Sequence, residues 1–371
     1  MNAQLLRLSL LTVGVLLASQ VYAAPSYAFT NLGPLGSMSS AALAINNAGQ
    51  VAGYVYTAGT PQHATRWDGT TATDLGILGA ILSYANGINN AGQVAGSAFF
   101  VGKNADHAIR WDGTTATDLN KLEGTNSAAF AINDAGQVAG YTTTASGAFH
   151  ATRWDGTTAT DLGTPGGIHS VALAINNAGQ VAGNVYTTEA PHATRWDGTT
   201  ATNLDTLGGN FSQAFSINNA GQVAGHAATA GNANYHATRW DGTTATDLGT
   251  LGGTHSVAFS INNAGQVVGY AFTAGSNALH ATRWDGTTVI DLNSFLTAGE
   301  ISAGWVLQVA NGINDSGSIV GSAYNIQTGR DSAFLLTANP SLSAIPEPNT
   351  YIMLLTGLGL MGFMVRRCKA S

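Results

Sequence analysis

The body of the chain consists of short runs in which hydrophobic and polar residues alternate, the period expected of half-buried β-strands. In one typical stretch, the run Ser256–Ile261 is followed by the turn residues Asn262–Gly265 and by a second run, Gln266–Phe272. After a variable loop come a third run, His280–Trp284, and a fourth, Thr287–Leu292. The Asp-Gly pair between these last two runs favours a tight hairpin. The pattern therefore predicts four short strands joined by turns.

This four-strand pattern is repeated along the chain. An Ile-Asn-Asn/Asp-x-Gly motif begins at seven isoleucines: Ile45, Ile88, Ile132, Ile175, Ile217, Ile261 and Ile313. An Arg-Trp-Asp-Gly-Thr-Thr motif occurs six times, with its tryptophans at Trp67, Trp111, Trp154, Trp196, Trp240 and Trp284. Four strands in about 43 residues is the size of one β-propeller blade. A β-solenoid also repeats, but hairpin-linked strands argue against it.

The two ends of the repeat array complement each other. The seventh unit has three runs and stops at Asn339 and Pro340 without a fourth. The segment Tyr27–Gly33 precedes the first unit and looks like an isolated fourth run, comparable with Thr244–Gly249. A ring closed by this N-terminal strand would leave no exposed sheet edge. We therefore predict an all-β, seven-bladed β-propeller over residues 24–338.

Residues 1–23 have the features of a secretory signal peptide. Arg7 supplies the positive charge, Leu8–Ala18 the apolar segment, and Val21–Ala23 the small-x-small cleavage signature. An uncleaved membrane anchor is the alternative, but the apolar run is shorter than the roughly 20 residues of a spanning helix.

The C-terminal end has three parts in a fixed order. A linker, residues 339–349, contains Pro346, Glu347 and Pro348, and residues 350–371 form a predicted transmembrane helix with a basic tail. The tail includes Arg366 and Arg367, and positive charge after an apolar segment favours a cytoplasmic end.

This arrangement resembles the PEP-CTERM sorting signal of Gram-negative bacteria that make exopolysaccharide. The resemblance implies that an exosortase processes the chain near Pro346–Pro348 after export through the Sec translocon. It also implies transient contact with the inner membrane and a mature protein at the cell surface or in the extracellular matrix. A plain C-terminal membrane anchor is the alternative.

Composition narrows the possible functions. Charged residues make up only 9% of the 371 residues and the net charge is -7, with no basic run in the body. Nucleic-acid binding is therefore not expected. The single cysteine, Cys368, excludes a disulfide within the chain and a CxxC metal site.

The third runs carry a further resemblance. A His-Ala-Thr triplet precedes the tryptophan at His63, His150, His192, His236 and His280, with variants at His107 and at Asp331–Phe334. Together with the segment Asp247–Gly253, these triplets resemble the HAF repeats of bacterial extracellular proteins. That family carries no activity that could be assigned to particular residues.

The repeated polar residues are expected to be structural. Zinc needs ligands at about 2.0–2.1 Å, and histidines on third strands of different blades lie too far apart for that, so a hydrogen bond within each blade is expected. The Arg-Trp pairs suit packing or cation–π contacts between blades; carbohydrate stacking is an alternative. The Asn-Asn/Asp turns match ordinary turn formers, with calcium loops as the alternative. No catalytic, cofactor-binding or metal-ligating residue is predicted.

Loop residues that differ between units are the candidates for recognition, because loops on a rigid scaffold often bind ligands. The invariant turns are expected on one face of the ring and the variable loops on the other. The candidate binding residues on the variable face are Phe99, Phe100, Lys103, Glu123, Phe211, Tyr235, Glu300 and Trp305. His169, Glu189 and His255 are also expected there, and the insertion Ser294–Gly304 is the largest break in the repeat.

These patterns favour an exported, non-catalytic repeat protein that is structural or binds glycan or protein in association with exopolysaccharide. The main alternative is a polysaccharide hydrolase or lyase that uses unique acids such as Glu123 and Glu300. A third possibility is a calcium-dependent adhesive scaffold.

Overall fold

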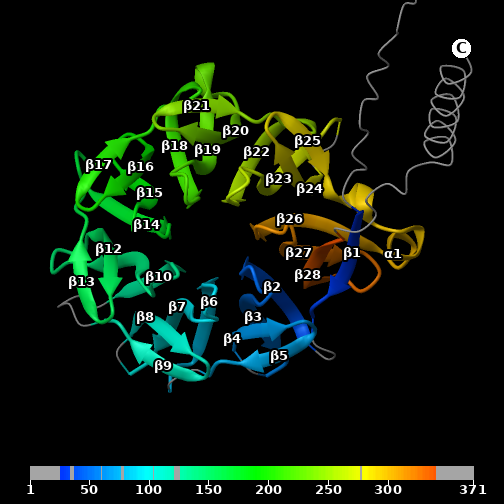
Figure 1. The fold of residues 1–371 in the computed structure, drawn as a ribbon, viewed down its shortest axis with the longest axis horizontal. Coiled ribbons are helices and arrows are strands. Elements are labelled where there is room, and N and C mark those ends of the chain that lie inside the picture. The colour runs from blue at the N-terminus through cyan, green and yellow to red at the C-terminus, as the bar shows by residue number, and fades with distance from the viewer. Residues whose placement is uncertain are drawn as a thin grey trace, which may run out of the picture. The chain divides into compact units, whose positions relative to one another are not determined.

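The computed structural model describes residues 26–33, 37–59, 61–76, 79–102, 104–120, 126–275 and 278–339. Within residues 27–338 they form seven four-stranded antiparallel sheets arranged as blades around a central axis (Figure 1). The predicted seven-bladed, all-β propeller is therefore confirmed. The predicted signal peptide and the sorting residues Pro346, Glu347, Pro348, Arg366 and Arg367 lie outside the described residues.

The blades follow the chain in order, each beginning with its innermost strand. Blade 1 comprises β2(Ser37–Ile45), β3(Val51–Thr57), β4(His63–Asp68) and β5(Thr71–Asp74). Blade 2 comprises β6(Leu82–Ile88), β7(Val94–Phe100), β8(Ala105–Asp112) and β9(Thr115–Asp118). Blade 3 comprises β10(Ser127–Ile132), β11(Val138–Thr143), β12(Phe149–Asp155) and β13(Thr158–Asp161). Blade 4 comprises β14(His169–Ile175), β15(Val181–Tyr186), β16(Pro191–Asp197) and β17(Thr200–Asn203).

The remaining blades include the few helical turns. Blade 5 comprises β18(Gly208–Ile217), β19(Val223–Thr229), β20(Tyr235–Asp241) and β21(Thr244–Asp247), with the 3-10 turn η1(Ala230–Asn232). Blade 6 comprises β22(Gly252–Ile261), β23(Val267–Thr273), β24(Leu279–Asp285) and β25(Thr288–Asp291). Blade 7 comprises β26(Trp305–Ile313), β27(Ile319–Asn325), β28(Arg330–Asn339) and β1(Ser26–Asn31). The insertion before blade 7 forms η2(Leu292–Phe295) and the short helix α1(Ala298–Ser302).

The N-terminal strand β1 closes the ring by pairing with β28 at the outer edge of blade 7 (Figure 1). The Tyr27 hydroxyl donates to the Gly317 carbonyl at 3.0 Å and accepts from Arg283 Nη1 at 2.6 Å. Asn31 Oδ1 accepts from the Ser332 hydroxyl at 2.6 Å. The first and last described strands are thus joined through backbone pairing and polar contacts, as the isolated fourth run predicted.

The hydrophobic core is divided among the contacts between neighbouring blades. Each Arg-Trp motif places its tryptophan in such a contact; Trp240 of blade 5, for example, packs with Leu204 and Ala193 of blade 4. The adjacent arginines reach further round the ring: Arg66 Nη1 donates to the Gly92 carbonyl of the next blade at 3.5 Å. This agrees with the packing role expected for the Arg-Trp pairs.

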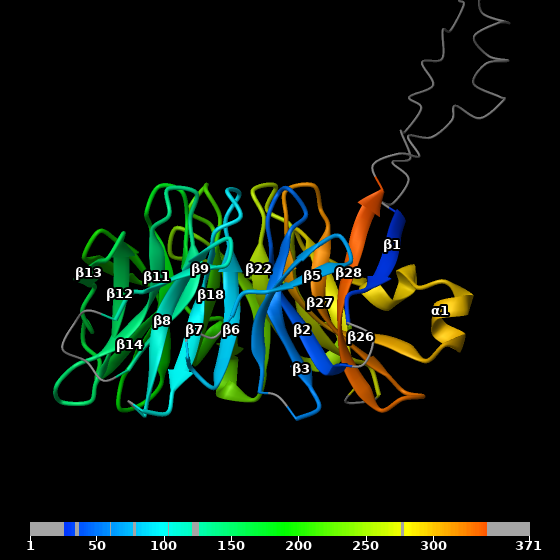
Figure 2. The same ribbon diagram turned by 90° about the horizontal axis from the view of Figure 1, so that it is seen from below.

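The molecule has two distinct faces. In each of the first six blades a glutamine of the first turn contacts the aspartate of the Asp-Gly hairpin, as when Gln50 Nε2 donates to Asp68 Oδ1 at 2.8 Å. Both kinds of invariant turn therefore share one face, which we call the turn face; it is uppermost in Figure 2, where β28 ends. The opposite face, the loop face, carries the variable loops, as predicted.

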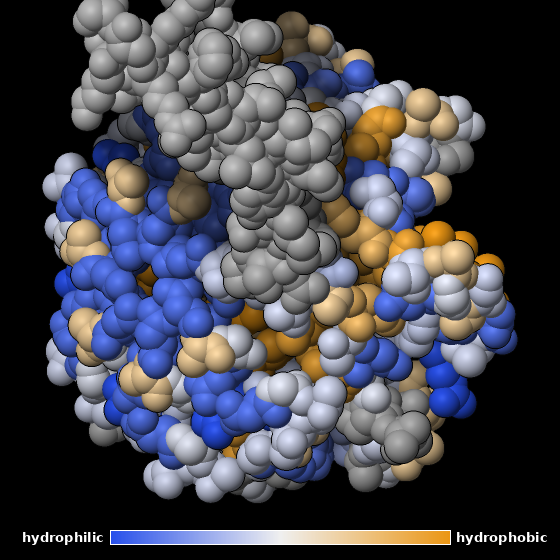
Figure 3. Space-filling view, turned by 45° about the vertical axis from the view of Figure 1, so that its right-hand side comes forward, coloured by the Kyte–Doolittle hydropathy of each residue, from blue (hydrophilic) through white to orange (hydrophobic). Residues whose placement is uncertain are grey.

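Seen obliquely, much of the surface is hydrophilic, in keeping with turns rich in Asn, Asp and Thr, and hydrophobic residues are gathered in a smaller area (Figure 3). In the described part of the chain, no helix is long and apolar enough to cross a membrane. The predicted transmembrane segment, residues 350–371, lies outside that part.

Candidate functional site

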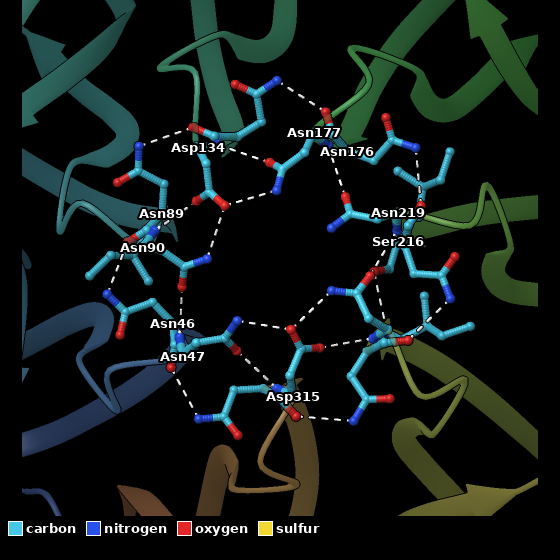
Figure 4. Close-up of a pocket in the computed structure, with 18 of the residues that line it drawn as sticks. Asn46, Asn47, Asn89, Asn90, Asp134, Asn176, Asn177, Ser216, Asn219 and Asp315 are labelled. Carbon is cyan, nitrogen blue, oxygen red and sulfur yellow. Dashed lines mark hydrogen bonds between the residues drawn. The ribbon is translucent and has the colours of Figure 1, made fainter.

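The first asparagine of each Ile-Asn-Asn/Asp motif belongs to a buried ring at the turn-face end of the central channel (Figure 4). Asn46 Oδ1 accepts from the Gln50 backbone N–H within the same turn, and its Nδ2 donates to the Asn89 carbonyl of the next blade at 2.9 Å. The same inter-blade bond is repeated seven times, until Asn314 donates to the Asn46 carbonyl at 3.0 Å. Each asparagine thus shapes its own turn and joins two blades.

The second residue of each motif forms a second ring, which lies nearer the channel axis than the first ring (Figure 4). Its members are Asn47, Asn90, Asp134, Asn177, Asn219, Asn263 and Asp315. Each backbone N–H donates to the side-chain oxygen of the next member, which again closes a circle of seven bonds. The two carboxylates also accept from the amides on both sides, so that Asp134 Oδ2 is bonded to Asn90 and Asn177. These bonds are drawn in Figure 4.

The carboxylates of the second ring are stabilised in their ionised form. Burial raises the pKa of Asp134, but hydrogen bonds from Asn90 and Asn177 outweigh it, so the pKa lies below its ordinary value. The pKa of Asp315 is lowered in the same way by Asn263 and Asn47. Within the described residues, no group of three or more His, Cys, Asp or Glu side chains is placed to hold a metal ion. The contacts support the turn-forming role expected of these residues.

Below the rings, the channel is lined by consecutive residues near the ends of the inner strands and encloses about 220 Å³. One layer carries the larger side chains: Leu43, Asn86, Phe130, Leu173, Phe215, Phe259 and Asn311. Because Phe215 and Phe259 come from neighbouring blades, their rings meet at 5.4 Å between centroids. This pair connects the channel with a larger group of aromatic side chains.

That group, which we call the aromatic patch, consists of Phe211, Phe215, His226, Tyr235, His255, Phe259, Tyr270 and Phe272. Neighbouring rings lie 4.2 to 6.4 Å apart and form a closed circuit across blades 5 and 6. Most members are half-buried, and several lie at strand ends next to the variable loops of the loop face. The longest other series among the described residues has four rings, from Phe130 through Tyr141 and Phe149 to His169.

Three side chains of the patch are held in uncharged forms. Burial lowers the pKa of His226 from 6.5 to about 4. The pKa of His255 is also lowered, first by burial and then by the nearby His236. Burial raises the pKa of Tyr270, and the neighbouring Tyr235 hydroxyl raises it further. At neutral pH the patch is therefore an uncharged aromatic surface.

Of the candidate binding residues, the structure brings Phe211 and Tyr235 together, with ring centroids 6.4 Å apart. His255, also expected on the variable face, joins them at 4.2 Å from Tyr235. The remaining members of the patch were not among the residues expected on the variable face: Phe215, His226, Phe259, Tyr270 and Phe272. The signal that could have found His226 is a histidine at a position where the other units have Tyr, Ser or Asn. Phe215 gives no such signal, because Phe130 and Phe259 occupy the same position in other units.

The other candidates lie elsewhere. Phe99 and Phe100 are in blade 2, where Phe100 contacts the His107 ring at 4.9 Å. Trp305 packs against Phe29 in blade 7 at 5.5 Å. Glu300 completes a capping box with Thr297 at the start of α1. Lys103 and Glu123 lie outside the described residues.

The repeated histidines form hydrogen bonds within their own blades. In blades 1, 2, 3, 5 and 6, Nδ1 of the histidine lies 2.7 to 2.8 Å from a carboxylate oxygen of the outermost strand, as in His63 with Asp74. This is the structural role expected from the repeat. Blade 4 has Asn203 in place of the aspartate.

Comparison with solved structures finds several propellers at low similarity. TolB from Acinetobacter baumannii is 12% identical, with a TM-score of 0.46 over 77% of this chain and 63% of that chain, less than two thirds of its length. A mutant Aleuria aurantia lectin in complex with Fucα1-6GlcNAc is 12% identical, with a TM-score of 0.40 over 73% of this chain and 100% of that chain. The β-propeller domain of the trilobed protease from Pyrococcus furiosus is 12% identical, with a TM-score of 0.41 over 69% and 95%.

No curated protein matches the chain significantly. The resemblance to HAF repeats therefore stays a prediction. Residues 344–367, however, match the family model of the PEP-CTERM protein-sorting motif. The matched range includes Pro346, Glu347, Pro348, Arg366 and Arg367, the residues predicted to form the signal. The chain thus ends in a PEP-CTERM protein-sorting motif, which implies that the protein is exported.

Proposed function

We propose that this exported propeller is a non-catalytic module that binds extracellular polysaccharide through the aromatic patch. The observation that carries the proposal is the closed circuit of eight rings across blades 5 and 6. The residues that form the contacts between blades recur from unit to unit, but this circuit of rings is confined to blades 5 and 6. Their position is therefore better explained by recognition than by the architecture.

The chemistry of the patch suits a sugar chain. Aromatic side chains offer a large, rigid apolar surface, and tyrosine and histidine add polar tips at little entropic cost. Pyranose rings present a face of C–H groups that stacks on such a surface and an edge of hydroxyls that can bond to the Tyr235 hydroxyl. Because the patch is uncharged at neutral pH, a neutral polysaccharide would not leave an unpaired charge behind.

The sorting motif supports the proposed location. We expect an exosortase to act near Pro346–Pro348 after Sec-dependent export, with transient anchoring in the inner membrane. The mature propeller would then remain at the cell surface or in the exopolysaccharide matrix. Cleavage of polysaccharide is less well supported, because Glu300, one of the two acids considered for it, is engaged in the helix cap.

A glycan-array screen with the purified full chain in detergent tests the proposal. The double variant Phe211→Ala/Tyr235→Ala should weaken polysaccharide binding at least about tenfold, a loss of about 1.4 kcal/mol. Phe149→Ala is the matched control, because Phe149 is also a partly exposed ring but belongs to blade 3. Equal binding by all three proteins would contradict the proposal, and newly formed reducing ends would show that the protein is an enzyme.

A further inference from the structure

Blade 4 departs from the other blades at the partner of its repeated histidine. In the five blades where the histidine faces an aspartate, the two side chains are hydrogen-bonded. In blade 4 the partner position is Asn203, and no hydrogen bond joins it to His192 in the described structure. The imidazole of His192 and the carboxamide of Asn203 are therefore left with free polar atoms on the same face of the sheet.

A second departure in blade 4 lies in the segment that leads into it. Each outermost strand is followed by a leucine, and the third residue after that leucine is hydrophobic in the other six units: Leu35, Leu78, Leu122, Leu207, Leu251 and Phe295. Leu207 and Leu251 pack against the cores of blades 5 and 6. Blade 4 has Pro165 at this position. A shorter, rigid side chain thus replaces one that fills space elsewhere.

The two departures meet at one cavity of about 330 Å³. Pro165 and Val185 form apolar parts of its wall, while Thr187, His192 and Asn203 contribute polar atoms. The space is present because Pro165 replaces the leucine of other blades. The hydrogen-bonding groups are available because Asn203 replaces the aspartate. Its volume lies at the lower end of the range for small-molecule sites, about 300–1,000 Å³.

We propose that this cavity, the blade 4 pocket, binds a single neutral glycosyl residue. Among the described lining residues there is no lysine, arginine or carboxylate, so a charged ligand would lack a strong partner. Imidazole, carboxamide and hydroxyl groups can pair with sugar hydroxyls, and Pro165 and Val185 can contact the apolar face of the ring. The proposal is independent of the aromatic patch, because the pocket shares no residue with it.

Nuclear magnetic resonance of the histidine side chains tests this site directly. The full chain, labelled with ¹⁵N-histidine, is titrated with the methyl glycosides of glucose, galactose, mannose, fucose, rhamnose and N-acetylglucosamine. At least one glycoside should shift the His192 imidazole signals in a saturable way while His236, its counterpart in blade 5, stays unchanged. If none of the six shifts His192, the proposal is wrong.

Two variants introduce into blade 4 the residues that other blades have at the same positions, and they distinguish an effect on ligand binding from an effect on folding. Pro165→Leu should fill the pocket, and Asn203→Asp should pair with His192, so each should weaken binding at least about tenfold. Because blade 5 carries the same residues, Leu207 and Asp247, the unfolding midpoint should not fall. Undiminished binding in both variants would overturn the assignment.

The control variant Asp247→Asn removes the carboxylate from blade 5, where Leu207 still occupies the space, and should leave binding at His192 unchanged. The proposed function can fail separately: Phe211→Ala/Tyr235→Ala should leave the His192 titration intact. Saturable binding at His192 without polysaccharide binding by the patch would support the pocket and refute only the patch.

Discussion

The burial of His226 predicts a specific loss of stability in mild acid. The side chain is buried in blade 5 against Phe211, Phe215 and Tyr235, and burial lowers its pKa from 6.5 to about 4. Between these two values, the unfolded chain takes up a proton at this residue but the folded chain does not. Protonation therefore favours the unfolded state, and the stability contributed by neutral His226 is lost as the pH falls from about 6.5 to about 4.

The size of the effect follows from the two pKa values. A shift of one unit corresponds to 1.36 kcal/mol, so complete titration would remove roughly 3 kcal/mol. Between pH 7.5 and pH 5.0 the expected loss from this residue is about 2 kcal/mol of the free energy of unfolding. That is a substantial part of the stability of a typical protein.

Urea unfolding at pH 7.5 and pH 5.0 measures this loss when wild type is compared with His226→Asn. Asparagine is a suitable replacement because blade 4 has Asn184 at the equivalent position, where it accepts from the Ala214 N–H of the next blade. The other histidines and carboxyl groups titrate in both proteins, so their contributions cancel in the difference. An equal loss of stability in both proteins would refute the reasoning.

Three further substitutions and one control, Gly102→Ala, test the architecture, each by urea unfolding. Asn262→Ala removes a bond to blade 7 and the bonds that shape its own turn, and should cost about 2–4 kcal/mol. In Gly225→Ala the new Cβ would meet the Gln213 carbonyl, and the cost should be about 1–3 kcal/mol; Gly102→Ala, with open space, should change stability by less than about 0.5 kcal/mol. Tyr27→Phe removes the hydroxyl that bonds to the Gly317 carbonyl and to Arg283 Nη1, and should cost about 1–3 kcal/mol. Unchanged unfolding midpoints for Asn262→Ala and Tyr27→Phe would contradict the closure scheme.

Much of the fold could be predicted because the sequence repeat gives the number of blades and the order of strands within each blade. Seven copies of the turn motif and the isolated run at Tyr27–Gly33 together require a closed ring, and β1 indeed completes blade 7. The division into two faces followed from hairpin geometry alone, since consecutive turns of an antiparallel sheet alternate between its ends. These features depend on local strand and turn preferences, which a single unit already shows.

The contacts between blades could not be predicted in the same way. The sequence indicates that Asn46 forms a turn, but its bond to the Asn89 carbonyl depends on the angle at which two blades meet. Likewise, Phe211 and Tyr235 were candidates as separate loop residues, and only the packing of blades 5 and 6 places His226 and His255 beside them. Glu300 looked like a candidate acid because it is unique, yet its isolated position suits a helix cap.

The distribution of symmetry in the ring separates architecture from recognition. Residues that recur in six or seven blades are engaged with one another: the asparagines join neighbouring turns, the tryptophans fill the contacts between blades, and most of the histidines bond to an aspartate. A ligand that contacted only such residues would find six or seven equivalent sites. A single site therefore requires a local departure from the repeat. Such a departure lowers stability, so it is expected where it serves a function. Blade 4 lacks, at the same place, both the packed leucine side chain and the histidine–aspartate hydrogen bond. In blades 5 and 6, aromatic rings are gathered at the channel. These two departures are where a ligand should be sought.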